Sequence, residues 1–368
     1  MKRIFLVMFI LTLCCGLLFT GCGGQQSGGE EAAGEPEGSA AEEKVFELSF
    51  VSEYMDKHPT VINGFMPWIK SIEEKSGNRI KITYYNPNTL CPQKDTFDST
   101  ISGMVDIGSS YCGYYPGKFP LNELMELPLI VPGAEAGSLV TWELYKKYPQ
   151  WQEEFKGTKM LWQWASATFQ LHTTQKQVKT LEDLKGMKII GWTPKVLEVL
   201  RLLGANPIEM TGTDTYLALE RGTAEGVLCP LAPVRSYKIS DAAKYHTIVD
   251  IMVGPFFAVM NQERFDELPA DLQQLFEETT GEKMAQISGK TLDEGAISDS
   301  QWLKENGHEF YVLPEEERAR WFEAVKPMHE KWISEMEAKG YDFAREIYHD
   351  ALRLSEEIGQ RTGRGYQE

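Results

Sequence analysis

Residues 180–231 decide the fold, and they read TLEDLKGMKIIGWTPKVLEVLRLLGANPIEMTGTDTYLALERGTAEGVLCPL. The run at 187–191 is short and apolar, as in a buried strand, and residues 194–203 carry apolar side chains at helical spacing up to a glycine stop. A second short helix (214–220) and a second short strand (226–228) follow in the same order. Strands that alternate with helices predict an α/β fold with a parallel or mixed sheet, whose ligands bind beyond the carboxyl ends of the strands.

The same alternation precedes this stretch. We expect strands at 46–50, 79–85 and 105–108, separated by helices at about 60–75 and 93–102. These strands would place three segments in loops at one rim of the sheet: 53–58, 86–91 and 109–115.

After this stretch, a strand at 256–260 should return the chain to the first sheet, and the tract from 269 onward is mostly helical. Pro327 should kink or break the helix expected at about 315–339, whose aromatic stripe we interpret as core packing. The length after residue 43 suggests two domains. Domain I would comprise 44–167 with about 255–305, and domain II, with a hinge helix, would comprise 168–254 with about 306–361.

The N-terminus has the pattern of an export signal. Lys2 and Arg3 precede an apolar run at 4–19, which is shorter than the roughly 20 residues that a membrane span needs. Small residues then lead to Cys22, as in a bacterial lipoprotein signal, so we expect a signal peptide at 1–21 and a lipid on Cys22. An ordinary cleaved signal with an incidental cysteine is the alternative. Residues 23–43 contain no aromatic or β-branched residue and should form a disordered tether.

The remaining composition excludes several classes of protein. A formal net charge of −17 argues against nucleic acid as a partner. Cys91, Cys112 and Cys229 are too far apart in the sequence for a metal cluster or a disulfide framework; one pair could bridge, or all three are buried thiols. The sequence has no Gly-rich phosphate loop, His-Glu-x-x-His or Gly-x-Ser-x-Gly motif, so we expect neither a cofactor nor an enzyme.

Several blocks resemble the solute-binding proteins of TRAP (tripartite ATP-independent periplasmic) transporters, and the likeness extends over about residues 45–340. TLEDLKGMKII, VLEVLRLLGANPIEM and TDTYLALERGTAEGVLCPL resemble consecutive segments of that family, and PFFAVMNQERFDELPADLQQLFEE resembles its return to the first domain. GNRIKITYYNPNTL, the Gly-x-x-Asp-Ile run at 103–107 and FPLNELMELPLI fit the first half. The resemblance implies a two-domain, periplasmic-binding-protein-like α/β fold with mixed sheets, hinge strands and a long C-terminal helix, closing over one ligand.

Two positions depart from the family pattern. Ile190 stands where the family usually has an arginine that pairs with a ligand carboxylate, and Cys229 stands where it often has an asparagine. The organic acids that the family usually binds therefore do not transfer safely to this chain.

Aromatic residues should gather around the cleft, although each could equally be core packing. Trp192 is the first candidate because it lies two residues beyond Ile190, and Tyr216 matches a family block. Arg235 could supply a cation from another direction, or it could be a surface arginine. The candidate ligand contacts are Trp192, Ile190, Cys229, Tyr216, Arg235, Tyr111, Trp164 and Tyr54.

Together these features predict an extracytoplasmic, lipid-anchored receptor in the cell envelope, in the periplasm or on the outer face of the membrane. It would deliver a small organic molecule to TRAP membrane subunits for ion-coupled uptake. An ABC-type solute-binding lipoprotein and a membrane-anchored enzyme are the alternatives. The ligand stays open: an apolar or aromatic compound, an acid held by Arg235 or backbone donors, or a cation in an aromatic cage.

Overall fold

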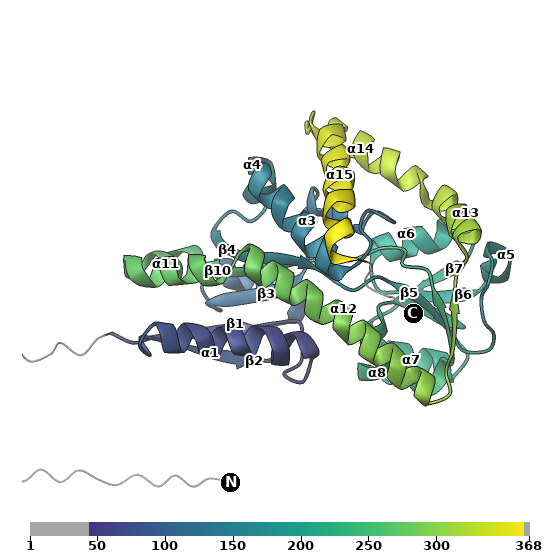
Figure 1. Ribbon diagram of the computed structural model, residues 1–368, viewed down its shortest axis with the longest axis horizontal. Helices are drawn as coiled ribbons and strands as arrows, with labels where there is room; N and C mark the ends of the chain where they lie inside the picture. Colours follow the sequence, from purple (N-terminus) through teal and green to yellow (C-terminus); the bar gives the residue numbers. More distant parts are fainter. Residues whose placement is uncertain (1–43, 364–368) are drawn as a thin grey trace, which may run out of the picture. The chain divides into compact units, whose positions relative to one another are not determined.

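The computed structural model describes residues 44–363, and the sequence predictions of a signal peptide, a lipidated Cys22 and a tether fall outside these residues. Two sheets organise this part of the chain (Figure 1). The first has the order β2-β1-β3-β10-β4, and we call it, with the helices that cover it, the first lobe. Its strands are β1 (Phe46–Val51), β2 (Ile80–Tyr85), β3 (Ile107–Tyr111), β4 (Thr158–Ala165) and β10 (Pro255–Asn261).

The second sheet has the order β11-β9-β5-β8-β6-β7 and forms the second lobe. Both sheets are mixed, as expected, because β10 runs antiparallel to β3 and β4, and β5 runs antiparallel to β8 and β9. The edge strand β7 contains Pro207, which an edge tolerates because one side of the strand needs no partner. The strands are β5 (Gln170–Thr173), β6 (Lys188–Gly191), β7 (Asn206–Glu209), β8 (Gly226–Cys229), β9 (Tyr245–Ile248) and β11 (Glu309–Val312).

Helices flank both sheets. In the first lobe they are α1 (Met66–Lys75), α2 (Thr96–Ile101), α3 (Ala134–Lys147), α4 (Pro149–Glu153), α10 (Gln262–Asp266) and α11 (Ala270–Thr279), with the π-helix η1 (Val61–Phe65) and the 3-10 helices η2 (Gln93–Asp95), η3 (Cys112–Tyr114) and η4 (Asn122–Glu126). In the second lobe they are α5 (Leu181–Leu184), α6 (Pro194–Leu202), α7 (Gly212–Glu220), α8 (Leu231–Ser236) and α9 (Ile239–Ala242).

Later helices join the lobes. The 24-residue α12 (Glu282–Glu305) packs on α3 and β4 of the first lobe and on α8 of the second, and Figure 1 shows it running from one sheet to the other. α13 (Glu315–Val325) packs on the second lobe, and α15 (Ala344–Thr362) packs on α3. The predicted break at Pro327 is confirmed, since α14 (Pro327–Ala338) begins there. The domain boundaries given above stay a prediction.

Two extended segments cross between the lobes and are bonded to each other. The amide of Phe169 donates to the carbonyl of Met252 at 2.9 Å, and the amide of Ser166 donates to the carbonyl of Gly254 at 2.8 Å. The side chain of Gln170 braces this crossing, because it donates to Asp250 at 2.7 Å and accepts from the amide of Val249 at 2.8 Å. The crossing is therefore a defined pair of hinge strands.

One predicted strand was misplaced. We expected β3 at 105–108 and a rim loop from 109, but the strand runs from Ile107 to Tyr111. It continues because β10 pairs with it as far as Tyr111, opposite Phe256. Ser109 and Ser110 therefore lie in the strand, and both are buried.

Candidate ligand-binding cleft

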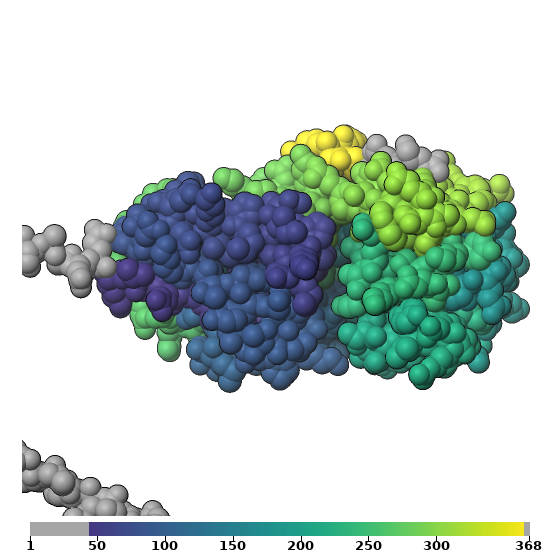
Figure 2. Space-filling view, turned by 90° about the horizontal axis from the view of Figure 1, so that it is seen from below, coloured from purple at the N-terminus to yellow at the C-terminus, as the bar shows by residue number. Residues whose placement is uncertain are grey.

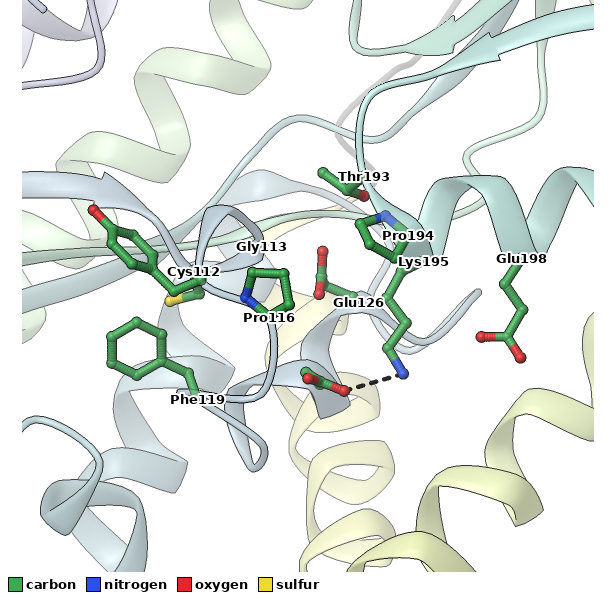
Figure 3. Close-up of a pocket in the computed structure, with 11 residues that line it drawn as sticks. Cys112, Gly113, Pro116, Phe119, Glu126, Thr193, Pro194, Lys195 and Glu198 are labelled. Carbon is green, nitrogen blue, oxygen red and sulfur yellow. Dashed lines mark ion pairs between the residues drawn. The ribbon is translucent and has the colours of Figure 1, made fainter. Parts of the chain in front are cut away.

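A hollow of about 190 Å³ lies where the two lobes meet. One side comes from the first lobe, at the loop after β3 and at η4, and includes Cys112 and Glu126. The other side is the start of α6 in the second lobe, with Thr193 and Lys195. Figure 2 shows the seam between these parts, blue against teal and green, and Figure 3 shows the residues that face each other across it.

Four rings pack together at the end of the first sheet from which η3 leaves, and we call them the aromatic wall: Tyr54, Tyr111, Trp164 and Phe256. Phe256 is the centre, with its ring 5.0 Å from Tyr111, 5.4 Å from Trp164 and 5.7 Å from Tyr54. The sheet register produces this stack, because Phe256 pairs with Tyr111 on one side and Trp164 on the other, and paired residues share a face. Tyr54 stacks on the neutral ring of His58 at 4.0 Å, and burial lowers the pKa of that histidine to about 4.

The second lobe contributes two further rings. The indole of Trp192 donates to Thr215 at 3.0 Å and meets the ring of Tyr237 edge to face at 5.8 Å. Tyr114 connects these rings to the first lobe: burial raises the pKa of its hydroxyl, and nearby Tyr237 and Glu53 raise it further. Aromatic groups of both lobes thus approach one another at the cleft.

Two buried carboxylates lie in the first lobe, and Glu126 is the one that lines the hollow. Glu53 follows β1, and its Oε2 accepts from the Ser109 hydroxyl at 2.7 Å, while its Oε1 is buried without a partner. Glu126 accepts a hydrogen bond from the Tyr111 hydroxyl. Burial raises the pKa of each carboxyl to about 7, and the hydrogen bonds from Ser109 and Tyr111 oppose that rise.

The cation among the residues lining the hollow is already paired. Lys195 of α6 forms an ion pair of 3.1 Å with Glu123 of η4, so this contact joins the lobes (Figure 3). No arginine of the described chain lines the hollow. The carboxylates outnumber the ammonium group there, which favours a ligand that is neutral or positively charged.

The residues predicted from sequence fall into two groups. Tyr54, Tyr111, Trp164 and Trp192 belong to one apolar cluster, although the residues that line the hollow do not include them, so their contact with a ligand stays a prediction. Ile190 and Cys229 are fully buried in the core, and the three cysteines Cys91, Cys112 and Cys229 are free thiols.

The two remaining candidates point elsewhere. Tyr216 donates to Glu220 at 2.6 Å on the outer side of α7. Arg235 donates to Asp299 at 2.6 Å, and its guanidinium lies 4.4 Å from the ring centroid of Trp302, so α12 holds and neutralises it.

Sequence reasoning missed Glu53, Glu126, Tyr237 and Phe256 as cleft residues. For Glu53 a signal existed, because residues 53–58 were expected at the rim of the sheet. For the other three no local pattern distinguishes them from ordinary core or surface positions.

A chain of buried histidines crosses the second sheet from β5 through β9 to the residue before β11. His172 Nδ1 lies 2.7 Å from His246 Nδ1, and His246 Nε2 lies 2.8 Å from His308 Nδ1. Lys244 can only donate to His308, and the carbonyl of Cys229 can only accept from His172, so the donors all point one way. Burial lowers the pKa of all three histidines, which keeps them neutral as the chain requires.

Comparison with known proteins decides the family. The model of the bacterial extracellular solute-binding proteins, family 7 (DctP), matches residues 51–335. The chain belongs to this family. Within residues 44–363, no helix has the length and hydrophobicity to span a bilayer.

Individual DctP-family proteins are similar along most of the chain. The C4-dicarboxylate-binding periplasmic protein DctP of Rhodobacter capsulatus is 26% identical over 270 residues, which cover 73% of this chain and 80% of that protein. The 2,3-diketo-L-gulonate-binding periplasmic protein YiaO of Escherichia coli is 25% identical over 205 residues, covering 55% and 62%.

Solved structures agree on the fold. A TRAP solute binding protein from Rhodoferax ferrireducens in complex with copurified benzoate matches with a TM-score of 0.81 at 27% identity, covering 87% of this chain and 100% of that one. A marine metagenome TRAP solute binding protein with bound 3-hydroxybenzoate matches with a TM-score of 0.80 at 25% identity, covering 86% and 99%. This chain is therefore a TRAP solute-binding protein with the two-domain α/β fold expected from its sequence.

Proposed function

We propose that this TRAP receptor binds a small aromatic compound between its lobes. The observation that carries the proposal is the aromatic wall, whose rings belong to one apolar cluster with Trp192 of the second lobe, since aromatic rings hold planar apolar ligands by large contact areas. The similar proteins from Rhodoferax ferrireducens and the marine metagenome bound benzoate and 3-hydroxybenzoate, which supports an aromatic ligand here.

The proposed mechanism is hinge closure. The crossing strands at 166–169 and 249–254 and the long α12 connect the lobes, while Lys195 and Glu123 meet across the cleft. A ligand that contacts both lobes has greater affinity for the closed state and so shifts the population toward it. The closed receptor would then be recognised by separate TRAP membrane subunits, which take up the ligand with an ion gradient. The chain would act as a receptor and not as an enzyme.

We further propose that the receptor is exported and anchored through Cys22. The support is the sequence alone: a basic start, an apolar run and small residues directly before the cysteine. Lipid on that residue, followed by a flexible acidic tether, would hold the folded lobes at the membrane.

A thermal-shift screen of aromatic acids, amines and alcohols, followed by small-angle scattering, tests the ligand and the mechanism. A ligand at about 100 times its Kd stabilises the folded state by about 2.7 kcal/mol, and it should also reduce the radius of gyration. Trp192→Ala should weaken the binding of the best compound at least ten-fold, while Tyr216→Ala, on the outer side of α7, should leave it unchanged. If sugar acids or aliphatic dicarboxylates give the only shifts, the aromatic proposal is wrong.

A further inference from the structure

One of the two carboxylate oxygens of Glu53 has no hydrogen-bond donor. Its Oε2 accepts from Ser109 at 2.7 Å and lies 3.4 Å from the Ser52 hydroxyl, but its Oε1 is shielded from solvent and accepts nothing. A buried carboxylate oxygen without a donor is costly, so such an atom in a native protein calls for an explanation. A ligand that donates to it is one such explanation.

The surroundings of Glu53 offer no compensating charge. The titratable groups that its charge acts on are four tyrosines and one cysteine: Tyr54, Tyr84, Cys112, Tyr114 and Tyr115. Burial keeps the pKa of each above its ordinary value, so all five are neutral at pH 8. No cation of the described chain lies close enough to lower the pKa of Glu53.

The rings beside Glu53 suit a cation as well as a planar group. Tyr54 directly follows Glu53 in the chain and tilts onto Phe256 at 5.7 Å, and Tyr114 meets Tyr111 of the same wall edge to face at 5.1 Å. The faces of aromatic rings carry negative potential and attract ammonium groups. The indole nitrogen of the fully buried Trp164, a donor, lies in the same wall, with the hydroxyl of Tyr54 as its neighbour.

An aromatic acid would meet unfavourable charges in this cleft. Its carboxylate would require a cation or several donors, yet Lys195 already pairs with Glu123, and Arg235 already pairs with Asp299. Glu126 adds a second carboxylate on the same side of the seam. An ammonium group avoids these like charges and satisfies the unpaired oxygen.

We infer that the ligand is an aromatic amine whose protonated amino group sits on the free Oε1 of Glu53, with its ring against the aromatic wall. This inference rests on the proposed function, of which it specifies the ligand class. Glu53 would then select charge, while Tyr54, Phe256 and Trp192 select shape.

Calorimetry with three matched probes tests the inference: 2-phenylethylamine, 2-phenylethanol and phenylacetate, which share a ring and differ in the polar group. At pH 8 the amine should bind at least ten-fold more tightly than the other two. Glu53→Gln should weaken the amine at least 30-fold and leave the alcohol within three-fold. Glu47→Gln, the same change at an exposed position of β1, serves as the matched control.

The pH dependence of the unsubstituted protein provides a second measurement that needs no variant. Amine binding should strengthen about ten-fold from pH 6 to pH 8 as Glu53 ionises. An acid held by a protonated Glu53 would show the opposite trend, and tighter binding of phenylacetate at either pH would overturn the inference. Failure of the amine to bind at about 10 mM would also overturn it. The proposed function would survive these results if another aromatic compound still closed the lobes.

Discussion

Two buried glutamates of the first lobe should respond differently to the same substitution. Glu53 and Glu154 both have a pKa raised to about 7 by burial. Glu154, however, is well bonded: it accepts from the amide of Leu121 at 2.6 Å and from the side chain of Asn122 at 2.7 Å. Glu53 leaves one oxygen unpaired. Glutamine in place of Glu53 keeps an acceptor for Ser109 and removes the buried charge.

The expected size follows from proton linkage. A carboxyl whose pKa rises from 4.5 to about 7 on folding destabilises the native state as pH increases through that window. Between pH 5 and pH 8 the loss is about 2.5 kcal/mol for a fully buried group, and because the residue as a whole is partly exposed we expect about 1.5–2 kcal/mol. Glu53→Gln should therefore gain that much relative to the unsubstituted protein when both are moved from pH 5 to pH 8.

Urea unfolding of the ligand-free protein at pH 5 and pH 8 measures this difference. Glu154→Gln should be destabilised at pH 5, by about 1–3 kcal/mol, because its amide group would face the Asn122 donor, and the same proton linkage should reduce that deficit at pH 8. Glu47→Gln, at an exposed position, should leave the free energy of unfolding unchanged at both pH values. If Glu53→Gln loses stability at pH 8, or gains the same amount at both pH values, then Oε1 of Glu53 is not an unpaired buried charge and the reasoning fails.

Four further changes test other features. His246→Leu should lower the free energy of unfolding by about 2–4 kcal/mol at pH 8, because His172 and His308 each lose a hydrogen-bond partner. This deficit should shrink toward pH 5, because folding lowers the pKa of His246 and the unsubstituted protein therefore loses stability as the pH falls. A deficit that grows on acidification would contradict the proposed histidine hydrogen-bond chain. Lys195→Glu should raise the ligand Kd about five-fold by opposing Glu123, and adding Glu123→Lys should restore it; no rescue would mean that the pair does not stabilise closure. Arg235→Ala should change the ligand Kd less than three-fold, because Arg235 pairs with Asp299. Loss of binding would show instead that this arginine contacts the ligand. Cys22→Ser should move the protein from the membrane to the soluble fraction, and a variant that stays membrane-bound would refute the anchor.

Much of the fold could be predicted because its signals are local. The strands β1, β6, β8 and β10 are apolar or alternating runs with buried side chains. Pro327 marks a helix break because a proline inside a helical pattern removes a backbone hydrogen bond. β3 was misplaced because Ser109 and Ser110 look like a loop. Only their pairing with β10, about 150 residues away, makes them a strand.

The site was predictable only in part, for the same physical reason. Trp192, Tyr54, Tyr111 and Trp164 could be proposed from strand ends at a shared rim, but Phe256, the centre of the aromatic wall, could not. The neutralisation of Arg235 depends on Asp299, which is 64 residues later, and the unpaired oxygen of Glu53 is visible only once every neighbour is in place. The histidine chain likewise joins residues 62 and 74 positions apart. A local sequence pattern does not predict which distant residue will form a hydrogen bond or ion pair with a given polar side chain.

The position of β10 in its sheet has a consequence for the order in which the protein can form. This strand lies between β3 and β4 and carries the central ring of the aromatic wall, Phe256, yet it follows the entire second sheet except β11 in the chain. A nascent chain that ends before residue 255 would leave β4 without a neighbour in its sheet and expose two strand edges that invite wrong pairing. The first sheet therefore cannot be completed until nearly all of the second sheet has been synthesised, which makes its closure a late, long-range step of folding.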